Sequence, residues 1–243
     1  MQELIKRIIV LWLTVLSLGI LTISATAEHE EIVEGLRELG IDVPDETVQE
    51  TEDILRRWEL RWGIQPDDFA LTLLSILGEG EESYDSDEHV WIWSPSSSSV
   101  YSFDAEVTDY TNMYKLFLQG IASIVPSFEA TDIQENIRAW TPLECKVNMW
   151  LHGNTLAEGI TTVSFSVNGH RYERSMDSLG DWFNDEAIGW INEVLAAEGF
   201  DGQILAFLDN GQGLILFYGD QILGERLKEL IPGLYYYRDD YLQ

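Results

Sequence analysis

The feature that most constrains the fold is a two-residue turn, Asn168-Gly169, between two segments of alternating character. Asn-Gly in this setting is typical of a type I′ β-hairpin, because both turn residues take a positive φ. The turn also sets the register of strands 161–167 and 170–176, placing Phe165 opposite Tyr172. One face of the hairpin is then mostly apolar and the other polar, which predicts an antiparallel sheet covered on one side.

Other strands and helices alternate with this hairpin along the chain. Apolar residues recur every three or four positions in residues 28–78, which predicts three short helices. Segments 203–208 and 214–218 are apolar on both faces, so we expect them to lie centrally in the sheet. The remaining predicted strands are 89–93 and 100–107 (joined as a hairpin), 130–137 and 145–151, and the predicted helices are 109–125, 184–198 and 221–230.

Together these elements predict an α+β fold. Hairpins imply antiparallel pairing, and helices between them imply a covering layer, so we expect an antiparallel sheet built from hairpins packed against helices, with an N-terminal helical segment. The predicted organisation is a signal peptide (1–27), a helical segment (28–78), an acidic linker or loop (79–88), an α+β domain (89–233) and an aromatic acidic tail (234–243).

The first 27 residues have the three parts of a secretory signal. Lys6 and Arg7 precede an apolar run over 8–23, and Ala25-Thr26-Ala27 is a small-x-small cleavage pattern. The alternative is an uncleaved anchor, but the apolar run covers about 16 residues, fewer than the roughly 20 that cross a bilayer. We therefore expect a secreted, extracellular protein that begins at Glu28 and has no transmembrane segment after cleavage.

The charge of the chain limits its partners. With 43 acidic and 14 basic residues the formal net charge is −29, so nucleic acid and anionic lipid surfaces repel it. A basic protein or peptide would be attracted, and abundant aromatic residues admit a glycan. The alternative reading is that the acidity serves solubility alone.

No residue pattern in the chain predicts catalysis or a cofactor. On the predicted strand Cys145 and His152 point to opposite faces, and Cys145 shares its face with Val147 and Leu151, which predicts a buried, unreactive thiol. Zinc-type histidine spacing, GxSxG and a phosphate-binding glycine loop are all missing from the sequence. Glycoside hydrolysis needs two facing carboxylates, but acid pairs are uninformative in so acidic a chain.

One metal site can be hypothesised. Asp85, Asp87 and Glu88 lie close together in the acidic loop, and carboxylate oxygens are the ligands that calcium prefers. The EF-hand pattern fails because His89 and Val90 stand where it requires Asp or Asn and then Gly. The alternative is a solvated acidic linker.

One ligand-binding surface can also be hypothesised. Trp91 and Trp93 share a face of one predicted strand, and Tyr101 lies on the next. Flat rings of this kind can stack on sugar faces, and the alternative is that they pack in the core.

From these observations we expect a non-catalytic binding or interaction module. Two other functions stay open: an extracellular carboxylate-based hydrolase acting on glycans or cell wall, and a secreted inhibitor of a basic partner.

Overall fold

The structure is a computed structural model that describes residues 28–62, 69–85, 90–106, 112–152, 157–208 and 212–236. The side chains of residue 62 and of 81–85, 90–93 and 148–152 are not described. The predicted signal peptide, 1–27, lies outside the described residues, as do Asp87 and Glu88 of the calcium hypothesis.

The expected α+β composition is confirmed, including the helical N-terminal segment. In chain order the elements are a helix at 28–38, α2 (Asp45–Trp62), α3 (Phe69–Gly78), β1 (Glu81–Asp85), β2 (Val90–Ser94), β3 (Val100–Asp104), α4 (Met113–Ile124), β4 (Thr131–Ala139), α5 (Pro142–His152), β5 (Gly159–Val167), β6 (His170–Ser178), α6 (Glu186–Ala197), β7 (Gln203–Leu208), β8 (Gly213–Gly219) and α7 (Gln221–Leu230). None of the helices in these ranges combines the length and apolarity that a membrane span requires.

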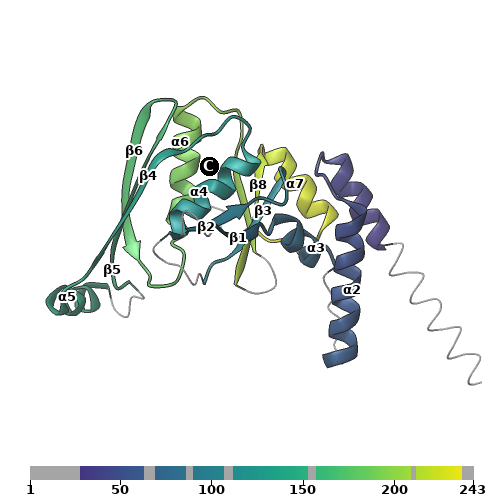
Figure 1. Cartoon of the computed structure of the whole chain (residues 1–243), viewed down its shortest axis with the longest axis horizontal. Coiled ribbons are helices and arrows are strands. Elements are labelled where there is room, and N and C mark those ends of the chain that lie inside the picture. Colours follow the sequence, from purple (N-terminus) through teal and green to yellow (C-terminus); the bar gives the residue numbers. More distant parts are fainter. Residues whose placement is uncertain are drawn as a thin grey trace, which may run out of the picture.

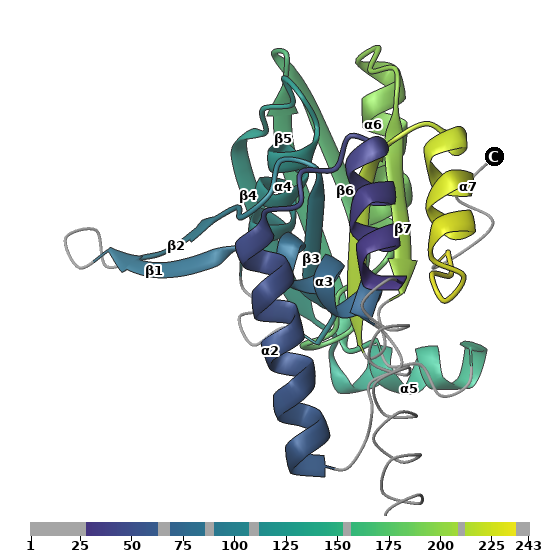
Figure 2. The ribbon, with the colours of Figure 1, turned by 90° about the vertical axis from the view of Figure 1, so that its right-hand side faces the viewer.

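The strands form two antiparallel sheets of three strands, ordered β3-β8-β7 and β4-β5-β6, and a separate hairpin β1-β2. Figure 1 shows the layers in succession: the β4-β5-β6 sheet, then α4 and α6, then the β3-β8-β7 sheet, then α3, α7 and the N-terminal helices. Figure 2, turned by 90°, shows the β1-β2 hairpin projecting from the body.

β8 lies at the centre of its sheet, as expected, but the expectation for β7 is wrong because β7 is an edge strand. Both strands are apolar on both faces because this sheet lies between two hydrophobic cores. Ile204 and Ala206 face the core around α4 and α6, whereas Leu205 and Phe207 face the core around α3 and α7. Burying an aliphatic or aromatic side chain of this size contributes about 1.5–3 kcal/mol. The sheet β3-β8-β7 therefore joins two hydrophobic cores.

The predicted Asn168-Gly169 hairpin is confirmed residue by residue. Asn168 and Gly169 have φ values of 50° and 83°, as a type I′ turn requires. The register pairs Val167 with His170 and Phe165 with Tyr172. Phe165 is fully buried against the helices between the sheets, while the strand face that carries Ser166 is polar.

The strand predicted at 145–151 is wrong, because this segment lies in helix α5. Thr141 and Glu144 form a reciprocal capping box: the Glu144 carboxylate accepts from the Thr141 backbone N–H at 2.8 Å, and the Thr141 hydroxyl accepts from the Glu144 N–H at 3.3 Å. Pro142 is the first residue of the helix, where its missing N–H costs nothing. These start signals outweigh a short alternation.

The hairpin predicted between 89–93 and 100–107 is also wrong. β2 pairs with β1, which comes from the acidic segment, and β3 pairs with β8 near the end of the chain. Local periodicity identifies a strand but does not identify its partner, which is decided by the layers on which each strand packs.

Candidate functional site

Tyr101, one of the three residues hypothesised to bind a ligand, is 4% exposed and lies in the core between the sheets. Its ring stacks on Phe103 with centroids 5.2 Å apart and packs directly on Gly120 of α4. Burial raises the pKa of the Tyr101 hydroxyl. This is the environment that the core-packing alternative expects.

The other hypothesised site residues belong to the β1-β2 hairpin or to the segment between its strands. Asp85 ends β1, and Trp91 and Trp93 lie on β2, where they pair with Tyr84 and Glu82. Across the ranges that the structure describes, no group of three or more histidine, cysteine, aspartate or glutamate side chains is placed to hold a metal ion.

Cys145 is exposed on α5, so the prediction of a buried thiol is wrong. The error follows from the wrong strand assignment, which placed Cys145 among apolar neighbours. Leu143 and Val147, two residues to either side on the same helix, are 71% and 47% exposed. Figures 1 and 2 show α5 at the far end of the long β4 and β5 strands.

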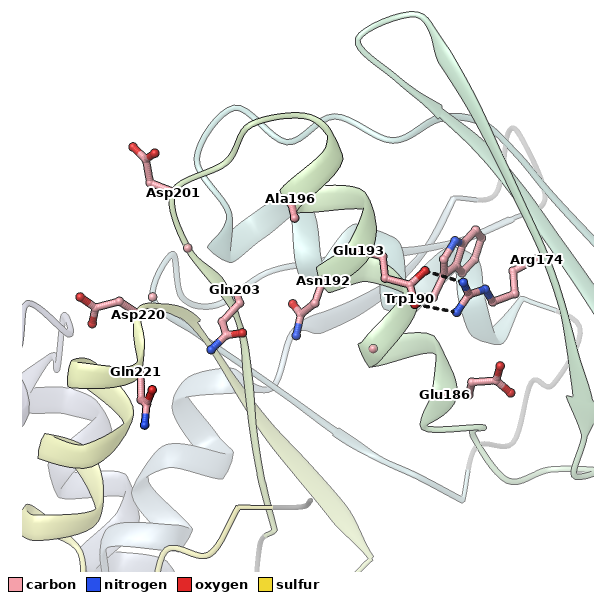
Figure 3. Close-up of a pocket in the computed structure, with 13 residues that line it drawn as sticks. Arg174, Glu186, Trp190, Asn192, Glu193, Ala196, Asp201, Gln203, Asp220 and Gln221 are labelled. Carbon is pink, nitrogen blue, oxygen red and sulfur yellow. Dashed lines mark hydrogen bonds and ion pairs between the residues drawn. The ribbon is translucent and has the colours of Figure 1, made fainter. Parts of the chain in front are cut away.

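A groove of about 770 Å³ runs along the outer side of α6 (Figure 3). Its residues come from the edge strand β6, from α6, from the start of β7 and from the junction between β8 and α7. They are Arg174, Glu186, Gly189, Trp190, Asn192, Glu193, Ala196, Asp201, Gly202, Gln203, Gly219, Asp220 and Gln221.

Hydrogen bonds at both ends hold α6 alongside β6. At its start, the Asn184 side chain accepts from the Glu186 backbone N–H at 3.0 Å and donates to the Asp177 carbonyl at 3.0 Å. At its end, the Glu198 carboxylate accepts from the Tyr172 hydroxyl and from Asn168 Nδ2, the latter at 3.0 Å. The helix therefore runs antiparallel to β6.

Glu198 is held as a carboxylate by these partners. The Tyr172 hydroxyl, Asn168 and His170 all hydrogen-bond it, and they lower its pKa to about 2. The shared hydrogen bond raises the pKa of Tyr172. This carboxylate thus joins the tip of the β5-β6 hairpin to the end of α6.

Arg174 of β6 forms one wall of the groove. Its Nη2 lies 2.5 Å from Glu193 Oε2, and its guanidinium lies 5.7 Å from the centre of the Trp190 ring. Figure 3 shows this arginine reaching from β6 toward α6, with Trp190 beside the ion pair. Trp190 is only 5% exposed and packs on Phe165, so it offers no open ring face to the groove.

Near β7 and α7, side chains bonded to the backbone hold the groove in shape. Asp220 caps α7 by accepting from the Leu223 N–H at 2.9 Å. The Asn192 amide spans the edge of β7, accepting from the Ile204 N–H at 2.6 Å and donating to the Ile204 carbonyl at 3.1 Å. The Tyr218 hydroxyl accepts from the Gly202 N–H at 2.9 Å.

The groove is acidic. Four carboxylates line it, and Arg174, its one cationic lining residue, is already paired with Glu193. Asp220 is used by the α7 cap, while Glu186 and Asp201 form no ion pair with any described residue. Apart from Arg174, the polar lining side chains are carboxylates, amides and the Trp190 indole, and the carboxylates can accept hydrogen bonds from a cationic group.

Sequence reasoning did not find this groove because its residues carry no motif and are spread over positions 174–221. Three comparisons were made, with protein-family models, with curated proteins and with solved structures, and none found a match to the chain.

Proposed function

We propose that the protein is an exported, non-catalytic binding module that takes a basic segment of a partner protein in the groove along α6. The observation that carries the proposal is the charge of the lining: four carboxylates face one arginine, and that arginine is already paired. Lysine and arginine side chains donate strong, charge-assisted hydrogen bonds to such carboxylates.

The whole chain favours the same class of partner. A formal net charge of −29 attracts a cationic segment from a distance and speeds its encounter with the groove. Glu186 and Asp201 then offer carboxylates that no described residue pairs. The amides of Gln203 and Gln221 add neutral hydrogen-bonding groups beside them.

A basic segment suits this groove better than a sugar does. A sugar-binding platform needs an open aromatic face, and Trp190 is covered by Arg174 and Phe165. An inhibitor of a basic enzyme would present the same acidic groove to its target. In that case the bound basic segment would belong to the enzyme's active site.

The test compares two pairs of charge-neutralising substitutions. Glu186→Gln with Asp201→Asn removes two groove charges, and Glu50→Gln with Glu59→Gln removes two exposed charges on α2. The probe is a fluorescein-labelled peptide of four Lys-Thr repeats, followed by fluorescence anisotropy at low and at physiological salt. A matching Glu-Thr peptide is the charge control.

We expect the groove pair to weaken binding and the α2 pair to change it less than twofold. Exposed charge pairs contribute roughly 0.5–1 kcal/mol each, so losing two weakens binding about 5- to 30-fold. Equal weakening by both pairs would show that binding depends only on net charge, and would refute binding in the groove. Cleavage of the peptide or of a soluble cell-wall glycan, lost in the groove variant, would favour the hydrolase instead.

A further inference from the structure

Part of the β6 edge has free backbone groups. In a hairpin closed by a two-residue turn, every second residue from His170 onward bonds to β5, which includes Tyr172 and Arg174. The N–H and C=O groups of Arg171, Glu173 and Ser175 therefore point away from β5. Among the described residues no hydrogen bond reaches these groups.

The side chains of this edge also leave it open. Arg171 folds onto the sheet, donating to the Asp132 carbonyl at 2.8 Å and to the Ser164 hydroxyl at 2.6 Å. The first backbone group on this edge that is already hydrogen-bonded is the Asp177 carbonyl, which accepts from Asn184 Nδ2. The open part of the edge thus covers residues 171–175.

The β7 edge is closed, and the β4 edge is interrupted near its start. On β7 the Asn192 amide bonds both backbone groups of Ile204, and the Leu208 N–H donates to the Tyr235 carbonyl at 3.0 Å. On β4 a bulge shifts the register between residues 131 and 134, and pairing with β5 is regular from 134 to 139. Amide caps and bulges are ways in which proteins prevent a sheet edge from adding another strand, and residues 171–175 of β6 have neither.

The open edge lies beside the acidic groove. Because α6 runs antiparallel to β6, the acidic residues of the helix are set out along the strand. Three contacts fix this alignment: Tyr172 with Glu198, Arg174 with Glu193, and Asp177 with Asn184. Figure 3 shows Glu186 and Glu193 on the α6 side of Arg174.

The acidic residues of α6 lie beside the end of the open edge. Glu193 is beside Arg174, and Glu186, about 10 Å farther along the helix axis, is near Asp177, just past residue 175. Every second side chain of an added strand would point toward α6, at intervals of about 7 Å. A flexible lysine or arginine side chain beside Arg174 reaches Glu193, and one at the end of the added strand extends toward Glu186.

We propose that the basic segment binds as an extended strand added to residues 171–175 of β6, with alternate lysine or arginine side chains directed to Glu186 and Glu193. This inference rests on the proposed function and adds the mode of recognition. Backbone hydrogen bonds to Arg171, Glu173 and Ser175 supply affinity, and the carboxylates on α6 select the basic side chains.

A partner segment suits this edge better than a second copy of the chain. Each copy carries a formal net charge of −29, so pairing two β6 edges would bring like charges together. A cationic segment is instead attracted by the negative charge of the chain.

The experiment measures backbone amide exchange by NMR in the purified protein, with and without a saturating peptide of four Lys-Thr repeats. We expect exchange at Arg171, Glu173 and Ser175 to slow by at least tenfold when the peptide binds. The amides of Tyr172 and Arg174, which already bond to β5, are internal controls and should change little.

Three outcomes overturn the inference in distinguishable ways. Peptide binding without protection of the three amides removes strand addition but leaves the basic-segment function intact. No binding in anisotropy removes both. Protection that appears without peptide and rises with protein concentration, together with dimers in sedimentation, would identify a second copy as the occupant.

Discussion

The Asn192 amide, which covers the edge of β7, provides the sharpest test of the structure around the groove. Its two hydrogen bonds to Ile204 satisfy both backbone groups that the edge would otherwise expose. Each contributes about 1 kcal/mol net, so replacing Asn192 with alanine loses about 2 kcal/mol. Alanine is the better helix former by about 0.6 kcal/mol, which leaves a net loss near 1.5 kcal/mol.

This loss is measurable as a thermal shift. For a chain of this size 1 kcal/mol lowers Tm by roughly 2–4 °C, so Asn192→Ala should lower it by about 3–6 °C in differential scanning calorimetry. Asn192→Asp keeps the acceptor for the Ile204 N–H but sets a carboxylate oxygen against the Ile204 carbonyl. It should destabilise the protein at least as much at neutral pH.

The matched control is Asn136→Ala, on the exposed face of β4, where the amide has no partner among the described residues. We expect its Tm to stay within about 1 °C of the parent, since such exposed sites change stability by less than 0.5 kcal/mol. Equal Tm values for the Asn192→Ala and Asn136→Ala variants would refute the edge-capping role of Asn192.

The remaining predictions concern three other positions. The pKa of Glu198 is lowered to about 2, so its contribution to stability is fully present above its unfolded pKa near 4.3 and is lost as pH falls toward 2. The Glu198→Gln variant should therefore show a flatter dependence of Tm on pH between 5 and 2. An unchanged slope would contradict this. A Cβ at Gly120 would lie 2.2 Å from the Tyr101 ring, so Gly120→Ala should cost about 1–3 kcal/mol in urea unfolding. The exposed Cys145 should react with a thiol reagent as fast in the native protein as in urea, and Cys145→Ser should leave the urea midpoint unchanged.

Local signals predicted several elements correctly because those elements are stabilised by contacts between near neighbours. Gly40 and Gly199 have φ values of 83° and 79° and stand where the first helix and α6 end. The Asn168-Gly169 turn carries its own register. Thr141 and Glu144 also have the spacing of a capping box, but the strand predicted at 145–151 rested only on the apolar alternation that follows them.

The groove and the open edge could not be predicted in this way. Asn192 bonds Ile204 twelve positions later, and Arg174 meets Glu193 nineteen positions later, so no short pattern signals either contact. The partner of β3 is β8, more than a hundred residues away in the sequence. Such pairings depend on how whole faces of helices and sheets pack against one another.

The sequence by itself determined the α+β class, the Asn168-Gly169 hairpin, the two-sided burial of β7 and β8 and the strongly acidic charge of the chain. These depend on periodicity, turn geometry and counts of ionisable groups, which are local or additive. Only the tertiary structure decided that α6 lies between the edges of two sheets, that its outer side forms an acidic groove, and that β7 is closed while β6 stays open from 171 to 175. An edge is a property of what lies beside a strand, and its neighbours come from distant parts of the chain.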